Sequence, residues 1–545
     1  MSGVDPVTLE VVRNQLEGVA TEMGQVLIRS ARSPNIKERR DCSTALFDRE
    51  GRMVAQAEHI PVHLGAMPRA VETVLDRDLV PGDVVALNDP FAGGTHLPDV
   101  TLVAPIAVAG EVTGYAVSRA HHADVGGATP GSMPAGATEI YEEGLRIPGV
   151  RLVRGGEMDE DLLETVLANV RDPEERRADL RAQIAATDRA EERIRELSEE
   201  SEIDLETAFE AVIDYSRERV EGELEGFPDG EYRARDVMEG DGRTDEEIPI
   251  EATVRIDGRR MEVDFAGTAS QVAGNVNAPL AVATSAVYFV LRSVTDPEIP
   301  PNHGCYAPVS VEAPEGSLLN PRPPAAVVGG NVETSQRVTD VVLAALEECV
   351  PDRVPAQGQG TMNNFVIGGR GGGGSSGDVD GTGEEGFTYY ETIGGGLGGR
   401  ADSDGIDGVQ VGMTNTLNTP VEALEAEYPL RVERYGLRPD TGGDGEFRGG
   451  LGIERAVRVE TDAVVSLLSE RRRTRPAGAA GGEPGATGEN LIDGRTVGAK
   501  TTESVSAGAT VTVRTPGGGG YGDPTERDPE ARERDREDGK VSDGE

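Results

Sequence analysis

Histidine and aspartate gather in two short segments of this 545-residue sequence. The chain contains six histidines, and five of them lie in its first quarter. The segment NDPFAGGTHLPDV places His96 three residues before Asp99, and SRAHHADVGG places His121 and His122 just before Asp124. Because imidazole is the commonest metal ligand in proteins and a frequent acid or base at neutral pH, these segments predict a metal centre with acid–base groups beside it.

Both segments are rich in glycine, which lets the backbone turn sharply so that an imidazole and a carboxylate converge on one point. A mixed set of this kind suits zinc, manganese or iron and leaves a position open for water or substrate. If the adjacent histidines His121 and His122 lie on a strand, only one of them faces the metal. Asp41, in KERRDCS, is a further candidate ligand because the neighbouring basic residues would keep it ionised.

Several of these polar residues also have a purely structural interpretation. Asp89 precedes a proline and is a good turn former. His59 and His63, in EHIPVHLG, would line the wall of a pocket, and His303, in NHGCYAP, is interpreted as structural.

Short buried strands and helices must position the two histidine segments. Apolar residues at three- and four-residue spacing predict a helix over residues 5–30. Alternating apolar residues around an Asp-Arg-Glu-Gly turn predict a hairpin over residues 44–57. Further strands are expected at PGDVVALNDPF, TLVAPIAV and TGYAVSRAHH, so each histidine segment lies at the end of a strand.

The composition changes along the chain and predicts a large, multi-lobed protein of mixed α/β (α+β) class. The expected parts are an N-terminal α/β lobe with the metal site (1–155), a charged helical arm (156–226), a β-rich α/β lobe (227–525) with a glycine-rich insertion (368–386), and a disordered acidic tail (526–545). The insertion lacks the Lys-Ser/Thr pair of a phosphate loop, so no ATP site is expected in this chain.

The net charge of −45 is spread along the whole sequence, and only three of the basic residues are lysines. Such an acidic chain is not expected to bind nucleic acid, because phosphate contacts need clustered Lys and Arg. A carboxylate-rich surface favours a salt-loving source, and an acidic partner surface is the alternative. Three isolated cysteines argue against a disulfide framework, and the absence of a long apolar segment predicts a cytoplasmic protein that does not enter a membrane.

The two histidine segments, NDPFAGGTHLPDVTLVAPI and RAHHADVGGATPGSM, resemble the hydantoinase B family, which includes N-methylhydantoinase B subunits, the C-terminal part of 5-oxoprolinase and an acetone carboxylase subunit. Further matching segments follow in order, among them DPVTLEVVRNQL, DFAGTASQVAGNVNAP, GGNVETSQRVTD, YYETIGGGLGGR and TPGGGGYGDP. The resemblance covers about residues 4–525.

This resemblance implies a divalent transition metal and a partner, a hydantoinase A-type ATPase that binds the ATP in a hetero-oligomer. The partner would phosphorylate the carbonyl oxygen of a hydantoin, N-methylhydantoin or 5-oxoproline-type ring, and attack by water would then open the ring with loss of phosphate. Carried onto this sequence, the implied metal ligands are Asp41, His96, Asp99 and His121, and the implied catalytic proton-transfer groups are His122 and Asp124.

Three other functions stay open at this point. The related reaction is ATP-dependent carboxylation of a ketone such as acetone, which uses a third small subunit. A non-catalytic chain that only stabilises the ATPase is a second alternative, although the intact HLPD and HHAD segments argue against it. A metallohydrolase that works without ATP or a partner is the third.

Overall fold

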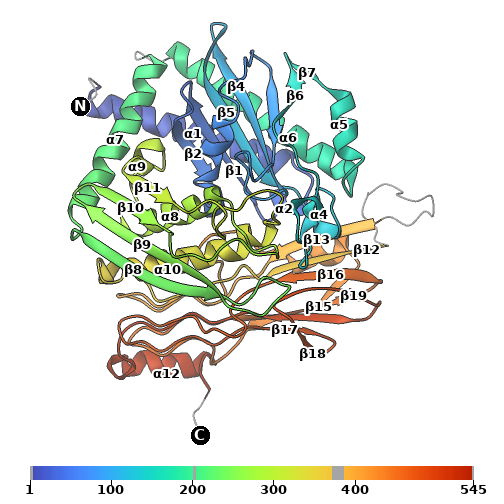
Figure 1. Cartoon of the computed structure of the whole chain (residues 1–545), viewed down its shortest axis with the longest axis vertical. Coiled ribbons are helices and arrows are strands. Elements are labelled where there is room, and N and C mark those ends of the chain that lie inside the picture. The colour runs from blue at the N-terminus through green and yellow to red at the C-terminus, as the bar shows by residue number, and fades with distance from the viewer. Residues whose placement is uncertain (1–3, 201–203, 371–385, 543–545) are drawn as a thin grey trace.

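The computed structural model describes residues 4–200, 204–370 and 386–542. An antiparallel sheet in the N-terminal part has the strand order β2-β1-β5-β4-β3-β6-β7 (Figure 1). One histidine segment leads into β4 and the other ends β5. The strands are β1 (Cys42–Asp48), β2 (Met53–Glu58), β3 (Val84–Leu87), β4 (Asp99–Val108), β5 (Glu111–His121), β6 (Val150–Arg154) and β7 (Glu157–Met158).

Helices cover both faces of this sheet, because its central strands carry apolar side chains on both faces. Along β5, Val117 faces a core shared with α3 and α8, whereas Ala116 faces a core shared with α1 and α6. The helix predicted over residues 5–30 is confirmed as α1, which Asp5 caps through its side chain. The helices are α1 (Pro6–Ser30), α2 (Pro34–Lys37), α3 (Ala66–Glu72), α4 (Ile140–Glu143), α5 (Glu160–Leu167), α6 (Pro173–Glu200), α7 (Leu205–Glu225) and α8 (Leu280–Val294).

The charged segment expected as a helical arm forms α5, α6 and α7, and α6 packs along α1 and against β4 and β5. The residues that α6 buries in the core shared with α1 recur at three- and four-residue spacing and give one apolar face to an otherwise charged helix. They are Ala182, Ala186, Ala190, Ile194 and Leu197. α6 therefore forms a layer over the N-terminal sheet.

A second sheet, in the order β11-β10-β9-β8, shares one apolar core with α8, α10 and the first sheet. Alternate residues of β9 are buried, which gives this strand a core face and a more exposed face. The elements are β8 (Gly230–Met238), β9 (Ile248–Asp257), β10 (Arg260–Asp264), α9 (His303–Tyr306), β11 (Val309–Glu312), a π-helical turn (Gly330–Thr334) and α10 (Ser335–Leu346).

The C-terminal part contains two further sheets, β13-β12-β16-β19 and β14-β15-β20-β17-β18, which bury one apolar core between them. They lie at the bottom of the molecule in Figure 1. The elements are β12 (Asn364–Arg370), β13 (Gly386–Thr392), α11 (Val421–Glu427), β14 (Leu430–Leu437), β15 (Ile453–Val459), β16 (Ala463–Leu468), β17 (Glu489–Ile492), β18 (Arg495–Val497), β19 (Lys500–Val505), β20 (Thr510–Arg514) and α12 (Pro529–Glu537).

The chain therefore has the mixed α/β fold with several sheets that the sequence predicts. Most of the glycine-rich insertion, residues 371–385, lies outside the described residues. The flanking strands, β12 and β13, pair with each other along their full length. The tail expected to be disordered contains α12, and Arg527 before this helix is bonded to Asp404 and Asp535.

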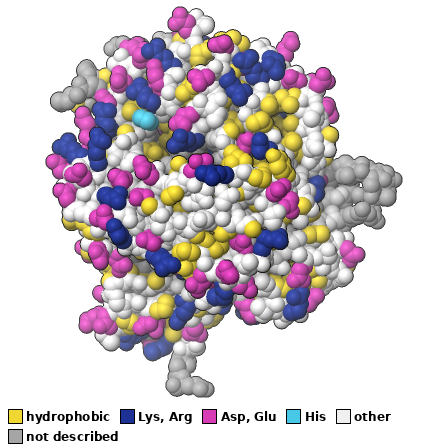
Figure 2. Space-filling view, in the orientation of Figure 1, with side chains coloured by type: hydrophobic (Ala, Val, Ile, Leu, Met, Phe, Trp, Pro, Cys, Tyr) yellow, Lys and Arg dark blue, Asp and Glu magenta, His cyan; other side chains and the backbone are white. Residues whose placement is uncertain are grey.

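The described residues contain no helix that is both long and apolar enough to cross a bilayer. Acidic and basic side chains are interspersed over the face shown in Figure 2.

Candidate metal centre

The register of the β4–β5 hairpin places Asp99 directly opposite His121. Side chains that are directly opposite on antiparallel strands point to the same face of the sheet. Val103 and Val117 share this alternation and lie in the core that contains α8 and α10, so Asp99 and His121 are directed toward that side. His122 is one position further along and is directed to the α6 side, where it contacts Gln183.

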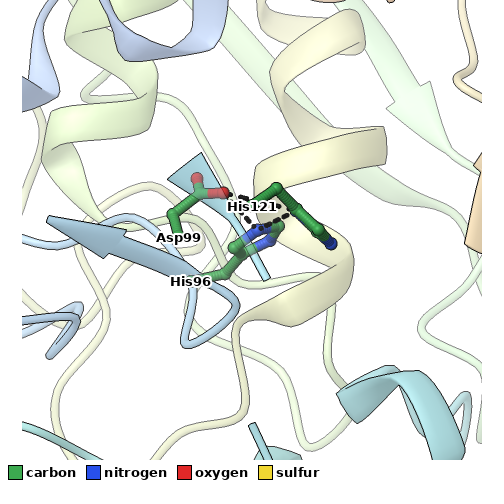
Figure 3. Close-up of side chains that lie close together, drawn as sticks. All are labelled: His96, Asp99 and His121. Carbon is green, nitrogen blue, oxygen red and sulfur yellow. Dashed lines mark hydrogen bonds and ion pairs between the residues drawn. The ribbon is translucent and has the colours of Figure 1, made fainter. Parts of the chain in front are cut away.

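Three ligand atoms converge at this end of the hairpin (Figure 3). His96 Nε2 lies 3.0 Å from Asp99 Oδ1, His121 Nδ1 lies 3.3 Å from the same oxygen, and the two nitrogens are 3.2 Å apart. All three residues are 1–2% exposed. Metal bonds of about 2.0–2.2 Å place neighbouring ligand atoms about 3.0–3.5 Å apart, so this triangle has the dimensions of a transition-metal site.

Asp99 is held in place by contacts to its other oxygen. Thr95 Oγ1 donates to Oδ2 at 2.7 Å, and His63 Nε2 lies 3.5 Å from Oδ2. His63 is itself fixed by Ser43, whose hydroxyl lies 2.9 Å from Nδ1. Burial opposes ionisation of Asp99, but the charge of His96 and hydrogen bonds from the three surrounding imidazoles outweigh it and hold the pKa of this carboxyl well below its usual range.

Asn331 approaches the site from the π-helical turn. Its Nδ2 lies 3.0 Å from His96 Nδ1, and its Oδ1 is buried with no hydrogen-bond partner among the described residues. If the amide is turned over, Oδ1 accepts a hydrogen bond from His96 Nδ1–H, and the lone pair of His96 Nε2 is left for a cation. Turned this way, Asn331 would hold His96 in the tautomer that offers Nε2 to a metal ion.

Packing between two segments that are distant in the sequence, one of which contains this turn, fixes its position. A Cβ at Gly330 would lie 1.9 Å from the carbonyl oxygen of Asn277, so only glycine fits there. The side chain of Asn277 in turn donates to the carbonyl of Ala326, just before the turn. The segments AGNVNAP and GGNVETSQ therefore pack together and position Asn331 beside His96.

Tyr390, from β13, holds His121 from the side. Its ring stacks on the imidazole with 4.6 Å between the centroids and 12° between the planes. The guanidinium of Arg39 lies 5.0 Å from the centre of the same ring and donates to the Tyr390 carbonyl. The Tyr390 hydroxyl donates to Asn364 Oδ1 at 3.0 Å, and burial raises its pKa. The C-terminal part of the chain thus completes a site that begins in the N-terminal sheet.

Asp41, the fourth predicted ligand, is buried next to the site, and its carbonyl oxygen accepts a hydrogen bond from the His121 amide at 3.0 Å. Its carboxylate is not part of the group formed by His96, Asp99 and His121. The role of Asp41 as a ligand therefore stays a prediction.

The two predicted proton-transfer groups lie apart from the three converging atoms. His122 Nε2 is 2.9 Å from Gln183 Oε1, and burial lowers the pKa of His122 to about 4. Asp124 accepts hydrogen bonds from two backbone amides of its own loop and forms an ion pair of 2.9 Å with Arg171. These contacts favour structural roles, and the predicted proton-transfer roles receive no support from them.

Three of the residues around the candidate metal site have no role at a metal assigned from the sequence. His63 is expected from the sequence only as a wall residue, and Asn331 and Tyr390 stand in the segments GGNVETSQRVTD and YYETIGGGLGGR without a role. The glycines before Asn331 are the signal that could have found it, because paired glycines often mark a close backbone approach.

The sequence profile of the Hydantoinase B/oxoprolinase family matches residues 5–524, so the chain belongs to this family. It is 40% identical over 549 residues to 5-oxoprolinase 1 of Arabidopsis thaliana, a match that covers 95% of this chain and 42% of the plant protein. It is 32% identical over 570 residues to a putative B-type subunit of a D-/L-hydantoinase from Pseudomonas sp. (strain NS671), covering 99% of this chain and 93% of that protein.

Among solved structures, the chain is similar to the ATP-dependent caprolactamase from Pseudomonas jessenii. The two share 31% sequence identity with a TM-score of 0.89, and the match covers 99% of this chain and 95% of that chain. The resemblance deduced from the sequence is thereby confirmed at the level of family and fold.

Proposed function

We propose that this chain is the metal-binding subunit of an ATP-dependent cyclic amide hydrolase. The observation that carries the proposal is the buried triangle of two imidazoles and one carboxylate in a member of the Hydantoinase B/oxoprolinase family. The substrates would be rings of the hydantoin, N-methylhydantoin, 5-oxoproline or caprolactam type.

A separate ATPase partner is part of this proposal. The match covers 42% of the plant 5-oxoprolinase, so that longer protein has a further part outside the match. It also matches nearly the full length of a protein that is named as one subunit of a hydantoinase. The sequence shows no phosphate loop of its own. We infer that ATP is bound by a hydantoinase A-type partner and that the two chains act as a hetero-oligomer.

The division of labour follows from the chemistry of an unstrained ring amide, which is a poor electrophile. In the proposed reaction the partner phosphorylates the ring carbonyl oxygen with ATP. Water then adds to the activated carbon, the ring C–N bond breaks as the nitrogen takes a proton, and phosphate is released by a second water. A bound zinc, manganese or iron ion would supply Lewis acidity and a water of lowered pKa.

Residues of this chain would hold the metal ion and exclude bulk water from it. His96, Asp99 and His121 would hold the ion, while His63 orients Asp99 through its second oxygen. Tyr390 fixes the plane of His121 by stacking. Because these side chains are almost fully buried, they are shielded from bulk water.

The test is metal analysis combined with turnover. The chain is purified with its ATPase partner, and ATP-dependent opening of hydantoin, N-methylhydantoin, 5-oxoproline and caprolactam is measured for wild type, His96→Ala and His303→Ala. His303 is the matched control, since it lies on α9 outside the group of converging residues. We expect about one transition metal ion per chain, which His96→Ala loses together with ring opening and His303→Ala keeps.

Other outcomes would assign the chain differently. Full ring opening without metal would move the chemistry to the partner and leave this chain a stabilising role. Bound metal with no lactam opened, together with bicarbonate-dependent ATP use on a ketone, would favour a carboxylase. Ring opening without ATP or partner would identify a self-sufficient metallohydrolase.

A further inference from the structure

Glu333 is a fully buried carboxyl group just behind the metal site. It stands two residues after Asn331 in the same π-helical turn. Such turns are rare in proteins overall, and those that occur are often found at functional sites. Its Oε1 accepts hydrogen bonds from the Met362 amide at 3.1 Å and from Asn364 Nδ2 at 2.9 Å. Its Oε2 is buried with no hydrogen-bond partner within the described part of the chain.

A short chain of contacts connects Glu333 to a metal-site imidazole. Asn364 uses its nitrogen to bond Glu333 and its oxygen to accept from the Tyr390 hydroxyl. Tyr390 stacks on His121. Asn364 Nδ2 also donates to the Leu468 carbonyl at 3.1 Å, so Glu333, Tyr390 and Leu468 together fix the orientation of this amide.

The two cations that act on Glu333, Lys500 and Arg472, are bonded to other partners. Burial raises the pKa of Glu333 to about 8; a hydrogen bond with Thr361 and the charges of Lys500 and Arg472 lower this pKa, and the charge of Glu470 raises it. Lys500 forms its ion pair with Glu470, while the Arg472 side chain bonds to Asn363 and Asn490. Tyr390 is a further titratable neighbour, and burial raises its pKa.

We propose that Glu333 is a positioning residue of the metal centre, which acts through Asn364 and Tyr390 to hold the imidazole of His121. The inference rests on the metal centre proposed above and gives a role to a residue outside the ligand set. At neutral pH Glu333 is protonated. When it ionises, the buried charge attracts the Asn364 amide and the nearby cations, so the Tyr390–His121 stack shifts.

The test uses cobalt(II) as the only added probe, bound to the full chain in the absence of ATP, substrate and partner. The visible absorption of bound cobalt reports the geometry of its ligands. We expect the wild-type spectrum to change between pH 7 and 9, with a midpoint near the pKa of about 8. The Glu333→Gln spectrum stays constant over that range, because glutamine keeps the acceptor oxygen and has no proton to lose.

Three further variants separate this role from a general structural one. Glu143→Gln is the matched control, because Glu143 is also buried with a pKa raised to about 8 but bonds only the Val327 and Val328 amides. It should retain the wild-type pH change. Glu333→Ala and Tyr390→Phe should each weaken cobalt binding, by about tenfold for Glu333→Ala.

The outcomes are distinguishable from failure of the proposed function. A spectral change that persists in Glu333→Gln, or that disappears in Glu143→Gln, overturns the positioning role. So does a wild-type spectrum that does not change with pH. If cobalt binds and responds as expected but no lactam is opened, the positioning role stands and only the assigned reaction fails. If His96→Ala binds cobalt as well as wild type, the metal centre itself is wrong, and the inference falls with it.

Discussion

The adjacent residues His121 and His122 face opposite sides of the N-terminal sheet and have different partners. His121 is directed toward α10 and meets Asp99, His96 and Tyr390, and its Nε2 has no hydrogen-bond partner among the described residues. His122 is directed toward α6, and its Nε2 is bonded to Gln183. Both residues are 2% exposed. Burial alone therefore does not separate a candidate ligand from a core histidine, whereas the partners of each imidazole do.

The largest expected difference between these faces is in metal binding. His121→Ala removes one of three converging atoms and should weaken metal affinity by more than about a hundredfold, since loss of an outer partner alone costs about 10–100-fold. His122→Ala should bind metal as wild type does and lose about 1–3 kcal/mol of folding free energy, because Gln183 Oε1 is left unpaired. Metal analysis after dialysis and thermal denaturation measure the two effects. Equal loss of metal in both variants would contradict the assignment of His121 to metal binding and of His122 to the core.

A smaller effect is expected for the residue that orients Asp99 on the same face. His63→Ala leaves all three converging atoms in place but removes the contact to Asp99 Oδ2, so metal affinity should fall by about 10–100-fold. Competition with a chelator of known affinity measures the change. Ser43→Ala, which removes only the hydroxyl that fixes His63, should give a weaker effect in the same direction.

On the α6 side of the sheet, a variant of Asp124 distinguishes a structural role of this residue from a catalytic one. Asp124→Ala removes the acceptor for two loop amides and for Arg171, and we expect a loss of about 2–4 kcal/mol with unchanged metal content. Urea denaturation and metal analysis report these quantities. Unchanged stability with ring opening lost would instead support the proton-transfer role that the family resemblance implies for Asp124.

His122 should also give the protein an acid-dependent stability. Burial lowers its pKa to about 4, below the value of about 6.5 in the unfolded chain. Between these values the unfolded state binds more protons, so stability falls as pH falls from 6.5 to 4, by about 1.4 kcal/mol per pH unit. His122→Gln should lose this contribution, seen as a flatter dependence of melting temperature on pH. A dependence as steep as that of wild type would assign it to another group.

The sequence predicted the part of the site that is local in the chain. Asp99 and His121 lie at the ends of strands in one hairpin, where strand alternation brings their side chains to one face, and His96 stands three residues before Asp99 in a glycine-containing loop. Asn331 and Tyr390 reach the site through packing between distant segments, and no periodicity records which distant residue will arrive.

The tail shows a different limit of sequence reasoning. Its charged composition predicted disorder, yet the structure forms α12 there. The stabilising contacts come from elsewhere in the fold, because Arg527 is bonded to Asp404 in a distant loop as well as to Asp535 within the helix. Composition alone does not reveal a partner that folding supplies.

The Asp99–His121 register also has a consequence for the order of assembly. Two of the three converging residues belong to a single hairpin, whose contacts are local and therefore close early, with little loss of chain entropy. Asn331 and Tyr390 arrive only when segments made much later in synthesis dock against it. Asp99 and His121 are therefore expected to meet before the chain is complete, and docking of the C-terminal half then brings Asn331 and Tyr390 beside them.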